Sequence, residues 1–217
     1  MKGVFITFEG LDGCGKTTQI TKLAQRLQRA RVPVTVAREP GGTSVGEAIR
    51  RILLDPATKE LEPVAELLLY FSSRAQNVAQ VIRPALQQGH VVLCDRFTDA
   101  SVAYQGHGRG LGPEAVRMLD LLACRGLKPD YTILIDIDPS TSVHRARERN
   151  KGAGEDEGRL ESESQKFFTK VRDAYLEIRR ADPRRVHLVN GERTPDSVHR
   201  EIWDLVTSWG IVKKERN

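Results

Sequence analysis

Short apolar runs alternate along the chain with longer helical patterns, and this alternation limits the possible folds more than any other feature. Each run is apolar almost throughout and rich in Val and Ile, as is typical of strands buried on both faces of a parallel sheet. The runs are Val4–Phe8, Val34–Ala37, Val91–Cys94, Tyr131–Ile137 and Val186–Val189. The helical patterns are Lys16–Arg31, Ser44–Leu54, Leu61–Gln88, Pro113–Arg125, Pro139–Arg149, Leu160–Arg180 and Pro195–Ser208. We expect an α/β fold in which helices sandwich a five-stranded parallel sheet, within a single domain spanning residues 1–217.

Composition narrows the function classes. The chain has 34 basic and 29 acidic residues and a net charge of +5, so charge alone gives little support for a nucleic-acid partner. Cys14, Cys94 and Cys124 are far apart, which disfavours a disulfide framework or a zinc site. No secretory-signal pattern follows Met1, and no apolar run approaches the roughly 20 residues that a membrane helix needs. We expect a cytoplasmic protein that binds neither nucleic acid nor a membrane.

A glycine-rich segment follows the first apolar run and matches the pattern G-x-x-x-x-G-K-[ST]. Its glycines allow backbone N–H groups to turn toward phosphate oxygens, and the helix that follows adds its positive end. Lys16 is expected to reach the β- and γ-phosphates and Thr17 to bind Mg²⁺. The sequence therefore predicts phosphoryl transfer from a nucleoside triphosphate. The residues of this donor site are Gly10, Leu11, Asp12, Gly13, Cys14, Gly15, Lys16, Thr17 and Thr18.

Asp95 and Arg96 directly follow the third apolar run. At the carboxyl end of a strand beside the phosphate loop, Asp95 is expected to bind Mg²⁺, often through water. Arg96 can hold a phosphate through two N–H groups. The structural alternative is a simple ion pair at the end of a strand, which the presence of the phosphate loop disfavours.

Three further segments are candidates for a second ligand pocket. Arg38 ends the second run and precedes Pro40, which favours a tight or cis turn, although a plain turn explains the segment equally well. Tyr70 and Arg74 lie on one face of a helix and could recognise a base, but a core aromatic beside a surface arginine is favoured on these residues alone. The third segment, Ser101–Gly110, is glycine-rich and is interpreted as a polar loop.

The stretch Asn150–Gly158 is glycine-rich and charged, with arginines on both sides. It is either a solvated connector or part of a lid, at about residues 145–160, that closes on phosphates. The arginines are Arg145, Arg147, Arg149 and Arg159.

Taken together, Phe8-Glu9-Gly10 with the phosphate loop, Arg38–Thr43, Asp95–Phe97 and Tyr104–Gly106 resemble the thymidylate kinase family of P-loop nucleoside monophosphate kinases, bacterial type with lid arginines. The matches occur in the family's order and span nearly the whole chain. The resemblance implies the P-loop NTPase fold, transfer of the γ-phosphoryl group of ATP to dTMP with Mg²⁺, and a homodimer. The products would be dTDP and ADP, in de novo and salvage dTTP biosynthesis.

The resemblance also implies roles for individual residues. The dTMP phosphate would lie on Arg38 and Arg96, and Asn190 would border adenine. The family commonly has Phe where this chain has Tyr70, so Phe71 is an alternative stacking ring. The implied dTMP site is Asp12, Arg38, Pro40, Tyr70, Phe71, Arg74, Arg96, Ser101, Tyr104 and Gln105.

The phosphate loop contains no arginine, so the resemblance implies that the lid supplies one. The implied catalytic residues are Lys16, Arg96, Arg147, Arg149 and Arg159, the last three as alternatives for the lid. Three other functions stay open: a kinase for another nucleoside monophosphate or a deoxynucleoside, a P-loop nucleotide-binding switch, and a nucleic-acid-binding ATPase.

Overall fold

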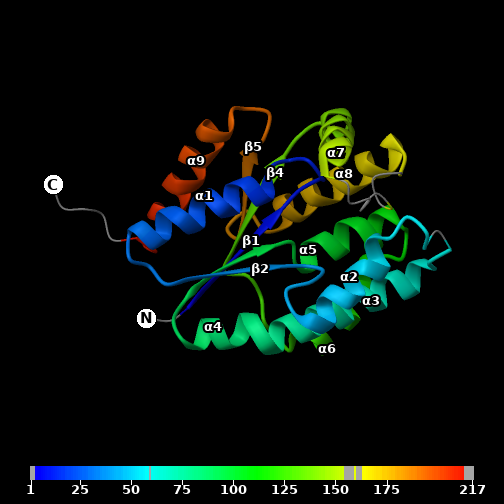
Figure 1. Cartoon of the computed structure of the whole chain (residues 1–217), viewed down its shortest axis with the longest axis horizontal. Coiled ribbons are helices and arrows are strands. Elements are labelled where there is room, and N and C mark those ends of the chain that lie inside the picture. The colour runs from blue at the N-terminus through cyan, green and yellow to red at the C-terminus, as the bar shows by residue number, and fades with distance from the viewer. Residues whose placement is uncertain (1–2, 59, 154–158, 160–162, 213–217) are drawn as a thin grey trace.

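The computed structural model describes residues 3–58, 60–153, 159 and 163–212, without the side chains at 146, 147 and 149–153. Its centre is a sheet of parallel strands in the order β2-β3-β1-β4-β5 (Figure 1). The strands are β1 (Val4–Glu9), β2 (Val34–Arg38), β3 (Val91–Asp95), β4 (Tyr131–Asp136) and β5 (Val186–Asn190). The predicted five-stranded parallel sheet is therefore confirmed.

Helices cover both faces of the sheet (Figure 1). They are α1 (Lys16–Arg29), α2 (Ser44–Leu54), α3 (Pro63–Asn77), α4 (Arg83–Gln87), α5 (Thr98–Ser101), α6 (Pro113–Cys124), α7 (Pro139–Ala153), α8 (Gln165–Ala181) and α9 (Pro195–Ser208). Alternate residues of β1 divide the core: Ile6 and Phe8 pack with α1 and α9, whereas Phe5 packs with α4 and the residues before it. None of the helices described is long and apolar enough to span a membrane.

Two segments differ from the sequence prediction. The single helix predicted over Leu61–Gln88 is interrupted by a π-helical turn, η1 (Val78–Ile82), because Pro84 has no N–H to continue the ordinary helical ladder. The segment interpreted as a polar loop is instead helical: α5 runs into a second π-helix, η2 (Val102–Gly108). Isolated π-turns occur often at functional sites.

The predicted connector also begins later than expected. Helix α7 extends to Ala153, so Asn150–Ala153 are helical and not part of a loop. The rest of that stretch, residues 154–158, lies outside the described residues. Pro139 begins this helix as predicted, as Pro113 begins α6 and Pro195 begins α9.

Candidate active site

The phosphate loop connects the end of β1 to the start of α1. Gly10, Gly13 and Gly15 have φ angles of 135°, 73° and 97°, which side-chain-bearing residues rarely adopt. A Cβ atom on Gly10 would lie 2.3 Å from the carbonyl oxygen of Ile135 on β4, so no larger residue fits there. Lys16 Nζ donates to the carbonyl oxygens of Leu11 (3.0 Å) and Gly10 (3.2 Å). The lysine is thus held by the loop's own backbone.

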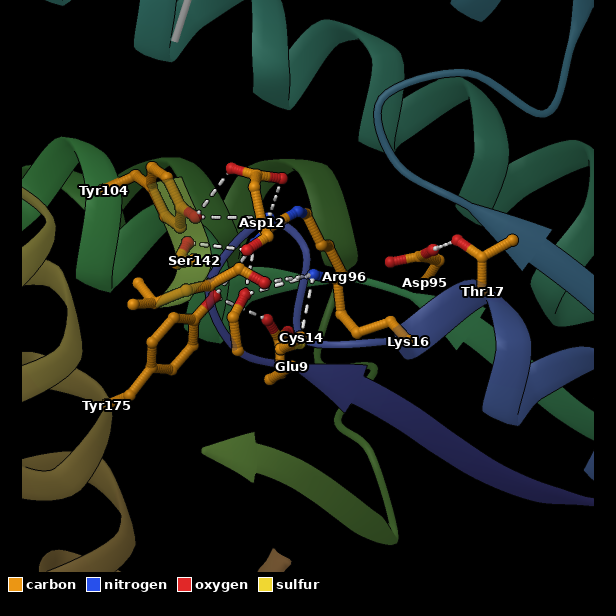
Figure 2. A network of polar contacts seen from close by, with 12 residues as sticks. Glu9, Asp12, Cys14, Lys16, Thr17, Asp95, Arg96, Tyr104, Ser142 and Tyr175 are labelled. Carbon is orange, nitrogen blue, oxygen red and sulfur yellow. Dashed lines mark hydrogen bonds and ion pairs between the residues drawn. The ribbon is translucent and has the colours of Figure 1, made fainter. Parts of the chain in front are cut away.

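Asp95 lies beside the loop because the register pairs it with Phe8 of β1 and Arg38 of β2. The Thr17 hydroxyl donates to Asp95 Oδ2 at 3.1 Å (Figure 2). A hydroxyl and a carboxylate are oxygen ligands of the type that Mg²⁺ uses, with substrate phosphates and water filling other positions. No cluster of three or more His, Cys, Asp or Glu among the described residues could hold a metal ion alone.

Arg96 lies at the centre of the polar network in Figure 2. Its backbone has a φ of 67°, unusual for a residue other than glycine. One guanidinium nitrogen donates to Asp12 (2.8 Å) and the Tyr104 hydroxyl (3.2 Å), the other to Gly10 O (3.1 Å) and the Tyr175 hydroxyl (3.2 Å). Burial works to raise the pKa of Asp12, but Arg96 and Lys16 outweigh it and hold that pKa well below its usual range. Asp12 is therefore ionised and fixes the arginine.

Glu9 holds the backbone that follows Arg96. It is fully buried, and its two carboxyl oxygens accept from Phe97 N (2.8 Å) and the Tyr175 hydroxyl (2.9 Å). Burial, with a smaller contribution from Asp99, raises the pKa of Glu9 to about 8. The sequence analysis quoted Glu9 only as part of a motif and gave it no role. Its one signal was an acidic residue directly after a buried apolar run.

A cleft of about 580 Å³ runs along the loop and the strand ends. The predicted site residues that line it are Asp12, Gly13, Gly15, Lys16, Thr17, Thr18, Arg38, Pro40, Tyr70, Asp95 and Arg96. The Glu39–Pro40 bond is cis, in agreement with the turn expected there. Arg38 is exposed and donates to both carboxyl oxygens of Glu47 on α2.

A second, narrow cavity of about 20 Å³ adjoins the cleft and shares Glu39, Tyr70 and Arg96 with it. It is lined by Glu39, Tyr70, Arg74, Arg96, Ala100, Ser101, Tyr104 and Gln105. Phe71 does not line it and instead packs in a buried cluster with Leu67 and Val116.

Arg74 is a buried arginine, which contradicts the alternative of a surface arginine beside a core aromatic. Its side chain is 1% exposed, and it donates to Glu39 (2.5 Å), Ser101 Oγ (3.0 Å) and Phe97 O (3.1 Å). The remaining nitrogen, Nη1, has no hydrogen-bond partner within the described part of the chain. A buried donor without a partner is unfavourable unless a ligand or water accepts from it.

Other predicted residues lie apart from the cleft. Arg159 is buried and donates to Glu66 Oε2 and Leu53 O, both at 2.6 Å. Asn190 ends β5 and lines a separate surface hollow with Asp136 and Asp138. Leu11 and Cys14 of the loop are buried in the core. The side chains of Arg147 and Arg149 lie outside the described residues.

Two arginines line the cleft without having been predicted as binding or catalytic residues, although Arg145 was named among the arginines beside the possible lid. Arg145 on α7 lines the cleft and donates to Gly191 O at 3.3 Å. Arg50 on α2 lines it and donates to Pro40 O at 3.0 Å. Their basic character was visible in the sequence, but only the packing of α2 and α7 places them here.

Comparison with known proteins agrees with this arrangement. The family model described as "Thymidylate kinase" matches residues 8–202. The chain is 50% identical over 205 residues to a thymidylate kinase of Syntrophotalea carbinolica, with 94% of each chain covered. It is 44% identical over 209 residues to the thymidylate kinase of Deinococcus radiodurans, with 96% of this chain and 98% of the relative covered.

Among solved structures, the thymidylate kinase from Ehrlichia chaffeensis is similar, with a TM-score of 0.77 and 30% sequence identity. The match covers 95% of this chain and all of that one. The shared fold, the phosphate loop and the matches over most of the length lead to one conclusion: the chain belongs to the thymidylate kinase family.

Proposed function

We propose that this chain transfers the γ-phosphoryl group of ATP to dTMP, giving dTDP and ADP, in dTTP biosynthesis. The observation that carries the proposal is the position of Arg96, which lines both the cleft beside the phosphate loop and the narrow cavity beyond it. A cation at that point can contact phosphates entering from either side. Its planar guanidinium group can donate two parallel N–H···O hydrogen bonds, which suits a phosphate that must be held in a fixed orientation.

The donor would bind along the loop, with its phosphates against backbone N–H groups and the start of α1. Lys16 would exchange its contacts with Leu11 O and Gly10 O for phosphate oxygens. Thr17 and Asp95 would hold Mg²⁺, which supplies charge neutralisation when bound. We propose that Asn190, at the end of β5, borders the adenine of ATP. Asn190 lines a separate hollow, whereas Arg145 lines the cleft itself.

The acceptor would occupy the cleft between Arg38 and Arg96 with its base in the narrow cavity. We assign base stacking to Tyr70 because it lines both spaces, whereas Phe71 is in the core. Arg74 would use its free Nη1 donors on the base. The cavity holds little more than a water molecule, so its side chains must move apart for a base to enter.

Positioning and charge neutralisation account for the chemistry. The acceptor is itself a phosphate oxyanion, so no strong general base is required, and we assign none. Lys16 and Arg96 would offset charge on the transferring group, with Arg147, Arg149 or Arg159 contributing from the predicted lid. Arg159 can do so only by leaving Glu66 and Leu53 O. Comparing kcat of the three single alanine variants assigns the role, because only the contributing arginine lowers kcat strongly.

A panel of acceptors tests the proposed function. ADP release from ATP is measured with dTMP, dUMP, other nucleoside monophosphates and deoxynucleosides, and with DNA. Strong stimulation by dTMP supports the proposal. Preference for another acceptor assigns a different kinase, and stimulation only by DNA assigns a nucleic-acid-dependent ATPase. Tight ATP binding without stimulation by any of them assigns a nucleotide-binding switch.

We further propose that the chain forms a homodimer and works in the cytoplasm. Support for a dimer comes from large exposed apolar side chains on α3 and α6, which pack against each other. They are Val64, Leu68, Met118, Leu121 and Leu122. Three free, buried cysteines agree with a reducing compartment.

A further inference from the structure

A buried carboxylate lies directly behind the narrow cavity without lining it. Glu66 on α3 is fully buried, and its Oε1 accepts from Gln105 Nε2 at 2.8 Å. Arg109 donates to both of its oxygens, at 3.3 and 3.2 Å, and Arg159 donates to Oε2 at 2.6 Å. Of the hydrogen-bond partners of Glu66 named here, only the side-chain amide of Gln105 also lines the cavity where a ligand would bind.

Glu66 is ionised in this setting. Burial works to raise its pKa, but hydrogen bonds from Gln105 and the charge of Arg109 outweigh burial and hold the pKa below its usual range. An ionised carboxylate can only accept hydrogen bonds. The neighbouring amide must then present its NH₂ group to Glu66.

This requirement fixes the orientation of an amide whose two ends are otherwise equivalent in shape. With Nε2 bonded to Glu66, the carbonyl oxygen of Gln105 is the end that remains for a ligand. That oxygen has no partner among the residues that the structure describes. Rotating the amide by 180° would place two oxygens against each other in a buried site, which is strongly unfavourable.

We propose that Glu66 is a positioning residue that sets which bases the acceptor site takes, by holding the Gln105 carbonyl toward the base. This inference rests on the proposed function of the cavity as the acceptor base site. Arg74 then offers donors and Gln105 offers an acceptor. Thymine and uracil have the complementary edge, a carbonyl O4 next to an N3–H. Cytosine has the opposite edge, an amino group next to an unprotonated N3, and is excluded.

The test compares kcat/KM for dTMP, dUMP and dCMP in the wild type and in Glu66→Gln. In the variant, Arg109 and Arg159 donate hydrogen bonds to the carbonyl oxygen of the new glutamine side chain at position 66. Its NH₂ group therefore faces Gln105, which turns its own NH₂ toward the base. The dTMP-to-dCMP ratio is expected to fall by about tenfold or more, the size of effect that one matched buried hydrogen bond gives. The dTMP-to-dUMP ratio stays constant because the two bases share the same edge.

If the three activities fall together and both ratios stay unchanged, the substitution has only damaged the fold in general. That result would overturn the proposal. A matched control is Glu163→Gln, which removes the other carboxylate bonded to Arg109 without touching Gln105. Both ratios should stay at wild-type values in that variant. A wild type that is not stimulated by dTMP would refute the proposed function instead, so the two failures are distinguishable.

A second variant covers the case in which Glu66→Gln does not fold. The double substitution Glu66→Gln with Gln105→Glu keeps one carboxylate near the two arginines and exchanges the donor and acceptor between positions 66 and 105. The carboxylate at position 105 still offers only acceptors to the base. The dTMP-to-dCMP ratio should return toward the wild-type value. A folded double variant that prefers dCMP contradicts the assignment.

Discussion

At the scale of single residues, Arg96 is held between Asp12 and Tyr104 and lines both the cleft and the narrow cavity. Arg96→Ala should lower kcat by on the order of a thousandfold or more, because it removes the cation that both substrates would share. Stability should fall by about 1–3 kcal/mol, because Asp12 loses its ion-pair partner, whereas the φ of 67° is the same for arginine and alanine. Steady-state kinetics with dTMP and urea unfolding measure the two effects. Near-normal turnover in a folded variant would remove Arg96 from the mechanism.

Glu9 leads to a prediction about pH and stability. Its pKa is raised from 4.5 to about 8, so the native state keeps a proton that the unfolded chain releases above about pH 4.5. Stability is therefore full below that pH and falls as pH rises toward 8, by up to about 1.4 kcal/mol per pH unit. Glu9→Gln retains an acceptor for Phe97 N but cannot ionise.

Urea unfolding of the wild type and of Glu9→Gln, at several values between pH 5 and pH 8.5, measures this effect. The variant should gain stability relative to the wild type as pH rises. Parallel curves for the two proteins would show that Glu9 is ionised in the folded state across the range. The alternative variant Tyr175→Phe removes a hydrogen bond that lowers the pKa of Glu9 but keeps the titrating group, so its stability should still fall as pH rises.

The candidate site residues that sequence reasoning could place together are those close to one another in the chain or at the ends of neighbouring strands. Lys16 and Thr17 are the first two residues of α1, directly after the phosphate loop, and Asp95 ends β3, which pairs with the strand before that loop. Glu66 and Arg159 contact each other across 93 residues of sequence, and no periodicity indicates such a pair. The burial of Arg74 on α3 was missed for the same reason, because its partner Glu39 follows strand β2 and lies 35 residues away in the sequence.

At the scale of elements, η2 carries Tyr104 and Gln105 and packs against α8. A Cβ atom on Gly108 would lie 2.7 Å from the Phe167 ring, whereas one on Gly106 meets nothing closer than 3.5 Å. Gly108→Ala should destabilise the protein by about 1–3 kcal/mol through overpacking. It should also raise KM for dTMP more than it lowers kcat, because η2 shifts the cavity wall and leaves the phosphate loop in place.

Gly106→Ala is the matched control in the same π-helix and should be close to wild type in both unfolding and KM. Thermal unfolding and dTMP titrations of the two variants make the comparison. Equal effects at the two positions would mean that the contact with Phe167 does not position η2.

The strands were predictable because burial on both faces leaves a simple signal, a short run of apolar residues. The starts of α6, α7 and α9 were marked by proline at the first turn. The two π-helical segments were not predictable in this way. A π-turn is stabilised by the residues that pack around it. From sequence alone, the glycines of η2 favour a loop, because the packing of Phe167 and Val171 of α8 against Gly108 is visible only in the structure.

At the scale of the whole molecule, the described surface has an apolar stripe that a lone domain does not need. Met118, Leu121 and Leu122 on α6 are 72%, 73% and 76% exposed and share one helix face. Val64 and Leu68 extend the stripe onto α3, at 56% and 48% exposure. The π-helix η2 also packs against α6, so the stripe is continuous with an element that lines the narrow cavity.

A two-fold dimer through this stripe would place α6 of one protomer against the same face of its partner. Leu122→Glu would then bring two like charges into an apolar interface and should give a monomer at concentrations where the wild type is a dimer. The folded protomer should keep its stability, because the replaced side chain is exposed in it. Sedimentation velocity measures the mass. Leu188→Glu on β5, at the opposite edge of the sheet and 42% exposed, is the control and should remain dimeric. A dimer that survives Leu122→Glu unchanged would place the interface on another face, whereas a monomeric wild type would contradict the dimer itself.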